Sequence, residues 1–287
     1  MADEQSAWFT EACKEAGSMV GFRITDHLHH EQTPFQTIDI YATAQFGNLM
    51  VIDGFIMLTQ RDNFLYHEML THPALFTHRD PRQVLIVGGG DCGTLREVLR
   101  HPQVERCLQV EIDERVTRLA ETYFPELCEA NSDPRAHLHF EDAIRYLAEA
   151  EDATLDLIIV DSTDPVGPAE GLFGPEFMRN CYRALGEGGI IVQQSESPLI
   201  HRDLIGQIRA NMQQAGFGEM RTLCFPQPCY PSGWWSATMA GKNCALGPFR
   251  ADDAEQRPFS TEYYNVGIHQ GALNPPEFLR RRFDSKQ

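Results

Sequence analysis

Hydrophobic and polar residues alternate in the first part of the chain in the way typical of strands with one exposed face. Positions 35–44 alternate apolar and polar residues, and the turn residues Asp53 and Gly54 separate two further apolar runs, 49–52 and 55–58. Such runs joined by tight turns predict a small antiparallel sheet of hairpins. The pattern becomes helical at 66–72, so we place a domain boundary near residue 70.

A different pattern fills positions 71–240, where short apolar runs alternate with segments of helical spacing. The runs 84–87, 155–160 and 189–194 predict buried strands, and 177–185 and 202–216 predict helices. Strands that alternate with helices are typical of a mostly parallel sheet. Prolines and glycines interrupt 162–173, so we expect an irregular loop there, suited to cover an active site. We expect a last helix at 276–283.

The run 84–87 leads directly into Gly88, Gly89, Gly90 and Asp91, and helical spacing follows at 94–100. Glycine lets the backbone turn tightly and approach a ligand closely. Strand, glycine loop and helix together are the nucleotide-binding opening of a doubly wound sheet. The predicted fold class is therefore α/β. A Rossmann-like, methyltransferase-like, doubly wound and mostly parallel sheet at 71–287 follows a small antiparallel β domain at 1–70.

Acidic residues end three of the predicted strands. Glu111 follows the glycine loop by about 20 residues, where an acidic side chain accepts hydrogen bonds from ribose hydroxyls. Asp142, followed by Ala143, ends another strand and is a candidate for the adenine amino group. Asp161 ends the run 155–160. A solvated carboxylate or a helix cap is the ordinary interpretation of each, but the glycine loop favours a nucleoside site.

The charge of Asp91 restricts the ligand. A phosphate, or the carboxylate of S-adenosylmethionine, would lie near the glycine loop and the helix that follows it. A carboxylate at position 91 repels both groups and attracts a cation such as an amine. The sequence therefore predicts a site for a positively charged adenosyl nucleoside without phosphate or carboxylate.

The composition excludes some partners. The chain has 287 residues and a net charge of −17, from 41 acidic and 24 basic residues. Nucleic-acid binding needs a basic surface, whereas an acidic field attracts cationic small molecules. We find no signal peptide and no apolar run long enough for a membrane span, so we expect a cytoplasmic protein that does not bind membranes.

Eight dispersed cysteines form no C-x-x-C pair and have no metal-ligand spacing with histidine, which indicates reduced thiols. His27, His29 and His30 lie beside polar residues, and we interpret them as part of a surface loop. We therefore expect no metal site.

Five ordered motifs resemble spermidine synthases, the polyamine aminopropyltransferases, and the resemblance covers nearly the whole chain. They are Gly88-Gly-Gly-Asp91, Glu111-Ile-Asp113, 161–168, Tyr66-His-Glu68 and Tyr230-Pro-Ser-Gly233. The resemblance implies transfer of an aminopropyl group from decarboxylated S-adenosylmethionine to a diamine, with putrescine the expected acceptor. Spermidine and methylthioadenosine would be the products. It implies no cofactor beyond this co-substrate, and it implies a homodimer or homotetramer assembled through the N-terminal sheet.

The resemblance also implies roles for single residues. Asp161 would be the general base and Tyr230 would orient the amine, helped by the Ser162 carbonyl, with Asp164 and Tyr66 in the same pocket. Gln36, His67 and Asp91 would contact the donor, alongside Gly88 of the loop. Glu196 would meet the distal ammonium of the diamine, and Trp8 would line the far end. Tyr66 and Tyr230 are equally explained as core aromatics with one hydrogen-bonded end.

Four positions depart from the family pattern: Cys92 and Ala143 replace glycines, Met57 replaces glutamine and Asn63 replaces glutamate. None removes an expected catalytic group, but they leave the amine acceptor open to cadaverine, agmatine or spermidine. Two other functions stay open as well. One is an amine N-methyltransferase that uses intact S-adenosylmethionine, which Asp91 disfavours. The other is a homologue that binds polyamines without catalysis.

Overall fold

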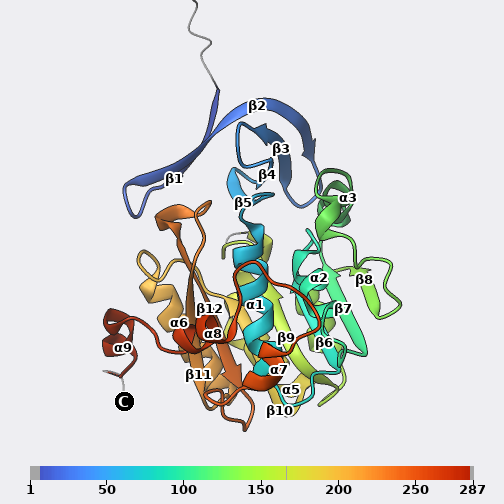
Figure 1. Ribbon diagram of the computed structural model, residues 1–287, viewed down its shortest axis with the longest axis vertical. Coiled ribbons are helices and arrows are strands. Elements are labelled where there is room, and N and C mark those ends of the chain that lie inside the picture. The colour runs from blue at the N-terminus through green and yellow to red at the C-terminus, as the bar shows by residue number, and fades with distance from the viewer. Residues whose placement is uncertain (1–6, 166, 285–287) are drawn as a thin grey trace, which may run out of the picture.

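The computed structural model describes residues 7–165 and 167–284, which form two sheets with helices around the second (Figure 1). The N-terminal sheet is antiparallel, with its strands in chain order. Its strands are β1 (Trp8–Cys13), β2 (Ser18–Gln32), β3 (Thr37–Thr43), β4 (Asn48–Ile52) and β5 (Phe55–Thr59). The hairpins expected at 35–58 are therefore present. The sequence did not predict β1 and β2, whose largely exposed residues lack a regular apolar alternation.

The second sheet has seven strands in the order β11-β12-β10-β9-β6-β7-β8. They are β6 (Gln83–Gly88), β7 (Arg106–Glu111), β8 (Ala136–Phe140), β9 (Leu155–Asp161), β10 (Leu185–Gln194), β11 (Met220–Pro226) and β12 (Trp234–Gly241). The five strands from β10 to β8 are parallel, and β12 runs antiparallel to both of its neighbours. The predicted doubly wound, mostly parallel sheet is confirmed.

Helices cover both faces of this sheet. They are α1 (Asn63–Thr77), α2 (Gly93–Leu99), α3 (Glu114–Tyr123), α4 (Ala143–Glu149), α5 (Pro175–Ala184), α6 (Arg202–Ala215), α7 (Ala251–Glu255), α8 (Val266–Ala272) and α9 (Glu277–Asp284). Three short 3₁₀ helices are η1 (Pro125–Leu127), η2 (Gly167–Phe173) and η3 (Pro231–Gly233). No helix among the described residues is long and apolar enough to cross a membrane.

The continuous apolar run of β6 follows from burial on both faces. Val84 and Ile86 pack in one core with residues of α1 and α2, while Leu85 and Val87 pack in the other core with residues of α4, α5 and α6. The chain leaves β6 toward β7 and β8, then returns to β9 and β10 on the other side. This reversal between β6 and β9 is where doubly wound sheets bind ligands, outside the carboxyl ends of the strands.

Two sequence expectations differ from the structure in detail. The segment expected to be irregular up to Phe173 contains η2, because a 3₁₀ turn accommodates Gly167 and Pro168 where an α-helix is disfavoured. The N-terminal sheet ends at Thr59 and α1 begins at Asn63, so a boundary near residue 70 falls inside α1. Helix α1 is buried along nearly all of its length and runs down the front of the second sheet (Figure 1).

Glu68 fastens α1 to the C-terminal segment. Its carboxylate is 2% exposed and accepts hydrogen bonds from three consecutive backbone N–H groups, those of Glu262 (2.8 Å), Tyr263 (2.9 Å) and Tyr264 (2.7 Å). Tyr66 and His67 precede Glu68 on the same helix and face the cavity described below. The C-terminal segment therefore helps to fix the position of two cavity residues.

Replacing Glu68 with glutamine tests this anchor. An amide offers one acceptor oxygen and turns an NH₂ group toward backbone donors, so we expect the free energy of unfolding to fall by about 1–3 kcal/mol. Urea denaturation measures it. Glu105→Gln is the matched control, because Glu105 forms an exposed ion pair with Arg82 and should change stability by less than about 0.5 kcal/mol. Equal stability of the two variants would contradict the proposed anchor.

Candidate active site

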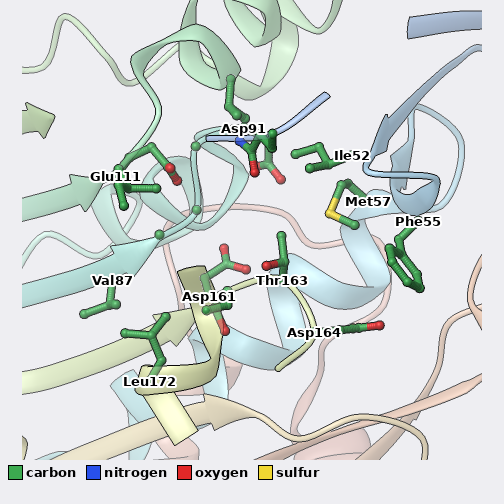
Figure 2. A pocket seen from close by; sticks show the side chains of 18 of the residues that line it. Ile52, Phe55, Met57, Val87, Asp91, Glu111, Asp161, Thr163, Asp164 and Leu172 are labelled. Carbon is green, nitrogen blue, oxygen red and sulfur yellow. The ribbon is translucent and has the colours of Figure 1, made fainter. Parts of the chain in front are cut away.

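A cavity opens at the carboxyl ends of β6, β7 and β9, under the N-terminal sheet (Figure 2). Asp91 and Asp161 point toward one another across it, and Asp164 lies on the side of Phe55 and Met57, away from Glu111. Twelve of the fourteen site residues expected from the sequence line the cavity, including Gln36, Tyr66, His67, Gly88, Asp91, Glu111, Asp142, Asp161 and Asp164. Ala143, Ser162 and Tyr230 also line it.

The glycine loop packs directly on the end of β9. Gly88 has φ +79°, and a Cβ added there would lie 2.2 Å from the carbonyl oxygen of Asp161. The N–H of Gly89 donates to the same oxygen at 2.7 Å. A side chain at position 88 would therefore both strain the backbone and push the loop away from Asp161.

Asp161 is buried, and both of its carboxylate oxygens accept hydrogen bonds. The Tyr66 hydroxyl donates to Oδ1 at 2.8 Å and the Thr94 hydroxyl donates to Oδ2 at 2.6 Å. Burial and the charge of Asp91 raise the pKa of Asp161 to about 6. A buried carboxylate held in one orientation with a raised pKa is well suited to act as a base near neutral pH.

Asp91 pairs with His67. The two side chains approach to 3.2 Å between His67 Nε2 and Asp91 Oδ1, and the N–H of Gly93 donates to Oδ1 at 2.7 Å. Burial favours the neutral form of each group, but their mutual attraction outweighs it. The pKa of Asp91 is therefore lowered and the pKa of His67 is raised. Asp91 thus keeps its negative charge in the cavity.

The end of the cavity where the sequence predicts a nucleoside contains Glu111 and Asp142. Glu111 ends β7, and its Oε1 accepts the N–H of Asp113 at 2.9 Å, while burial and nearby Asp113 raise its pKa to about 7. Asp142 caps α4 by accepting the N–H of Ile144 at 2.8 Å. Gln36 reaches this end from the N-terminal sheet and donates to Asp113 Oδ2 at 3.0 Å.

The cavity continues into a smaller one beyond Met57, lined by Glu11, Gln194 and Trp235 as well as by Asp164. Burial and then nearby Glu196 raise the pKa of Asp164 to about 8. Burial also raises the pKa of Glu11 to about 7. The N–H of Ile56 donates a hydrogen bond to Glu11 Oε2 at 2.7 Å, and Glu11 is 9% exposed. Two acids, Glu11 and Asp164, line this smaller cavity, and a cation bound between them would favour their ionised forms.

Glu196 lies just behind this smaller cavity, with its carboxylate 3.0 Å from the Nδ1 of His201. It is 2% exposed and contacts Asp164, and burial raises its pKa to about 7. The backbone of Glu196 adopts φ +65°, in the left-handed region that costs a non-glycine residue about 1 kcal/mol. This conformation turns the side chain toward Asp164 and His201.

Tyr230 lies where the two cavities meet. Its hydroxyl donates to the carbonyl oxygen of Met57, so both hydroxyl lone pairs remain free to accept hydrogen bonds from an amine. Trp235 packs 4.5 Å from the Tyr230 ring and lines the smaller cavity, whereas Trp234 packs against Phe278. Tyr230 and Trp235 therefore form an apolar wall where the two cavities meet.

Comparison with known proteins identifies the family. Residues 63–248 match the spermine/spermidine synthase domain, and residues 7–60 match the spermidine synthase tetramerisation domain. The chain belongs to the spermine/spermidine synthase family. It is 62% identical over 279 residues to a polyamine aminopropyltransferase of Methylococcus capsulatus, with 97% of each chain covered. It is 60% identical over 282 residues to one of Nitrosococcus oceani, with 98% of this chain and 99% of the relative covered.

Solved structures of the family agree with the fold throughout. A spermidine synthase in complex with the transition-state analogue AdoDATO has a TM-score of 0.94 and 32% identity, covering 98% of this chain and 96% of the other. The spermidine synthase from Thermotoga maritima has a TM-score of 0.92 and 31% identity, with the same coverage. The predicted family, fold class and aminopropyltransferase activity are confirmed, and the tetramerisation domain supports the predicted oligomer.

Apart from Glu196, which lies behind the smaller cavity, one residue expected from the family resemblance does not reach the site. Trp8 is 60% exposed on β1 and lines neither cavity. It lies three residues before Glu11, so the two side chains lie on opposite faces of the strand. Glu11 is the residue of β1 that faces the cavity, and sequence reasoning missed it. The stretch around Glu11 is mostly polar, so nothing in the sequence indicated that this side chain would be buried and hydrogen-bonded to Ile56.

Sequence reasoning also missed Thr94 and Asp113, which position the expected residues. Thr94 is the second residue of α2, so the glycine loop itself delivers its hydroxyl to Asp161. Asp113 accepts from Gln36 and also from the Thr33 hydroxyl at 2.7 Å, tying the N-terminal sheet to β7. The signal for Asp113 was its place two residues after Glu111 in the quoted family motif.

The departures from the family pattern differ in their effect on the cavity. Cys92 precedes α2 with φ +68°, and its buried thiol points into the core, 3.8 Å from Gln109 Nε2 and outside the cavity. Met57, Asn63 and Ala143 line the cavity. Cys92 therefore affects the loop conformation, whereas the other three affect the cavity wall.

The hydrogen bond from Thr94 predicts a specific pH dependence. A base must be ionised, so we expect kcat/KM to fall as the pH decreases through about 6, the pKa of Asp161. Thr94→Val removes a donor that stabilises the carboxylate, and should move this acidic limb upward by about one pH unit. Thr71→Val is the matched control, because the buried Thr71 hydroxyl has no hydrogen-bond partner among the described residues. An unshifted limb in Thr94→Val would refute the role of this bond.

Proposed function

We propose that the enzyme transfers the aminopropyl group of decarboxylated S-adenosylmethionine to a diamine, with putrescine as acceptor, giving spermidine and methylthioadenosine. The observation that carries this proposal is the row of buried acids from Asp91 through Asp161 and Asp164 to Glu11. A doubly charged donor and a doubly charged acceptor together match this row.

The nucleoside end of the cavity suits the donor. Glu111 and Asp142 would accept hydrogen bonds from ribose hydroxyls and the adenine amino group, with Ala143 against the base. Gly88 and Gly89 allow close approach of the nucleoside. Asp91, which His67 keeps ionised, would bind the ammonium of the aminopropyl group. Gln36 would help to close this end from the N-terminal sheet.

The other end suits the acceptor. The nucleophilic amine would lie between Asp161 and the lone pairs of Tyr230, with the Ser162 carbonyl as a further acceptor. The methylene chain would pass Tyr66, Met57 and Trp235. The distal ammonium would reach Asp164 and Glu11, backed by Glu196. Met57 adds apolar surface beside the chain, which suits methylene groups and offers no polar group to a longer polyamine.

The reaction is an in-line displacement. The amine nitrogen forms a bond to the methylene carbon next to the sulfonium, the carbon–sulfur bond breaks, and its electron pair neutralises the sulfur as a thioether. A sulfonium needs no acid to leave, so the enzyme must deprotonate the amine and align it. Asp161 would take the proton and later release it to solvent.

The raised pKa of Asp161 makes that proton transfer easier. An alkylammonium has a pKa of about 10, so transfer to Asp161, with a pKa of about 6, is uphill by about 5 kcal/mol. A carboxylate at the ordinary value of 3.8 would add about 3 kcal/mol to that cost. Burial of the ammonium in the cavity reduces the difference further by favouring its neutral form.

A homotetramer in the cytoplasm is the assembly and location that we propose. Residues 7–60 match a tetramerisation domain and include the whole N-terminal sheet. All eight cysteines are free, as expected in a reducing compartment. A homodimer remains the alternative assembly, and sedimentation equilibrium distinguishes the two.

N-methylation is the competing reaction. The two reactions use different donors, so an assay with each donor distinguishes aminopropyl transfer from methyl transfer. With purified enzyme and putrescine, we expect spermidine and methylthioadenosine from decarboxylated S-adenosylmethionine and no transfer from intact S-adenosylmethionine. Asp91 would repel the methionine carboxylate of the intact donor. Methylputrescine formed from intact S-adenosylmethionine would refute this proposal, as would binding of both substrates without turnover.

Asp161→Asn tests the general base. The amide keeps the shape of the carboxylate but cannot accept a proton, so we expect turnover to fall by about 100-fold or more with little change in donor binding. Single-turnover kinetics and donor titration measure the two effects. Asp152→Asn, at an exposed position, is the control. Turnover near that of the wild type would place the base elsewhere.

Asp91→Asn tests the contact to the donor ammonium. Loss of the charge should weaken binding of decarboxylated S-adenosylmethionine by about tenfold or more, but should change binding of methylthioadenosine by less than about threefold. Methylthioadenosine lacks the aminopropyl group and serves as the internal control. Equal weakening of both ligands would mean that Asp91 only supports the loop.

A further inference from the structure

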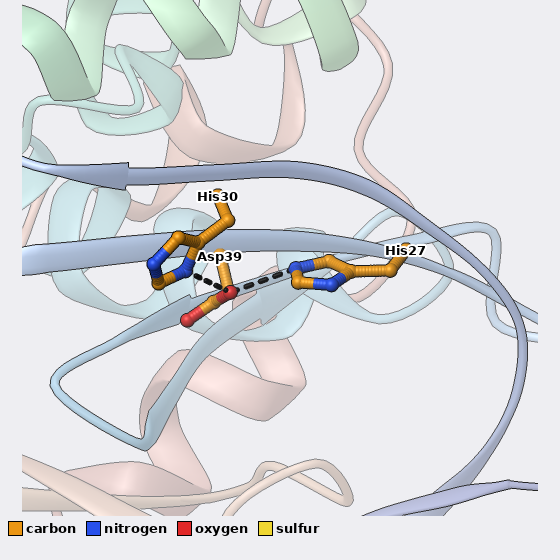
Figure 3. A group of neighbouring side chains, drawn as sticks. All are labelled: His27, His30 and Asp39. Atoms are coloured by element: carbon orange, nitrogen blue, oxygen red, sulfur yellow. Dashed lines mark hydrogen bonds and ion pairs between the residues drawn. The ribbon is translucent and has the colours of Figure 1, made fainter.

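Three metal-ligating side chains meet on the N-terminal sheet, away from the active site (Figure 3). His27 and His30 lie on β2 and Asp39 lies on β3. The Nε2 of His27 is 2.7 Å from Oδ1 of Asp39, and the Nδ1 of His30 is 2.8 Å from the same oxygen. Among the described residues, this is the one group of three or more histidine, cysteine or acidic side chains with suitable ligand atoms so close together.

A local irregularity of β2 creates this arrangement. Side chains three residues apart point to opposite faces of a regular strand, so His27 and His30 would diverge. The pairing of β2 with β3 shifts register between His27 and His29, so that His27 is opposite Tyr41 and His30 is opposite Asp39. Asp39 and Tyr41 share one face of β3. The bulge therefore brings both histidines to that face, and bulges commonly re-aim side chains in this way.

This finding corrects the interpretation of the histidines from the sequence alone. A surface loop was expected, but all three histidines are strand residues of β2. His29 points elsewhere and bonds Glu31 at 3.1 Å, and Glu31 is in turn paired with Arg115. His29 is therefore a built-in comparison for the cluster, with the same residue type on the same strand.

Neighbouring groups hold the cluster in a suitable orientation. The His27 ring stacks on Tyr41 with 4.4 Å between ring centroids and 21° between planes. Tyr41 lies on the same face of β3 as Asp39, so its ring also flanks the carboxylate. The side chains of His27 and His30 are 45% and 61% exposed, so an ion can enter and solvent can complete its coordination.

We propose that His27, His30 and Asp39 bind a divalent transition-metal ion of the Zn²⁺ class, which braces β2 against β3. Two imidazole nitrogens and one carboxylate are a common zinc ligand set, with water in the fourth position. Tetrahedral ligands with bonds of about 2.0 Å lie about 3.3 Å apart. Here the two histidine nitrogens lie 2.7 and 2.8 Å from the Asp39 oxygen, and all three ligand atoms lie within 4.8 Å of one another, so binding requires only side-chain adjustments. The exposed side chains can make these adjustments.

The location gives the ion a structural role. The cluster lies within residues 7–60, which match the tetramerisation domain, and none of its three residues lines either cavity of the candidate active site. An ion bound only by the folded sheet stabilises it by mass action. Zn²⁺ should therefore raise the melting temperature without a matching change in turnover.

The experiment uses full-length protein without a histidine tag, stripped with a chelator, and measures Zn²⁺ binding by equilibrium dialysis. We expect one ion per chain, and expect His30→Gln and Asp39→Asn to weaken its binding by at least tenfold. His29→Gln is the matched control and should bind within about twofold of the wild type. Circular dichroism shows whether each variant keeps its fold.

A thermal readout provides a second measurement. Zn²⁺ should raise the melting temperature of the wild type and of His29→Gln, and should not raise that of Asp39→Asn. Co²⁺ in place of Zn²⁺ should give visible absorption bands that vanish in His30→Gln. Absence of binding to the wild type, or binding that survives in both cluster variants, would overturn the proposal.

Discussion

The cost of burying several carboxylates close to one another is the physical constraint on which the active site depends. Asp161, Asp164, Glu11, Glu111 and Glu196 all have pKa values raised by burial, and most are raised further by one another. Without a cationic ligand, the protein lowers this cost by holding protons on several of them. In the proposed function, a polyamine would replace those protons with fixed ammonium groups. The cavity is therefore complementary to substrates that carry several positive charges.

The rest of the fold holds these acids in place against their repulsion. The parallel pairing of β6 with β9 places the glycine loop against Asp161. The N–H of Gly89 donates to the carbonyl oxygen of Asp161. Helix α1 supplies Tyr66 and His67 and is fastened to the C-terminal segment through Glu68. The N-terminal sheet supplies Glu11 and Gln36 as well as the surface expected to form the oligomer. The same small sheet therefore contributes to the proposed substrate site and carries the match to the tetramerisation domain.

Much of the site could be predicted from the sequence because its residues follow strands with clear signatures. A continuous apolar run, glycines and then an acid at a strand end are local patterns, and they located Asp91, Glu111 and Asp161. Glu11 and Thr94 could not be found this way. Glu11 reaches the cavity only because the N-terminal sheet folds over the second one, and Thr94 carries no signal beyond its helix. The cluster of His27, His30 and Asp39 depends on a bulge, which breaks the alternation that strand prediction uses.

The exchange of protons for ammonium groups can be measured directly. Titration calorimetry of putrescine binding in the presence of methylthioadenosine, at pH 7 in buffers of different ionisation enthalpy, gives the number of protons released. We expect net release, because an ammonium lowers the pKa of Asp164, Glu11 and Glu196 from about 7–8. Methylthioadenosine alone should release fewer. Putrescine binding with no proton release, or with proton uptake, would contradict this exchange of carboxyl protons for ammonium groups.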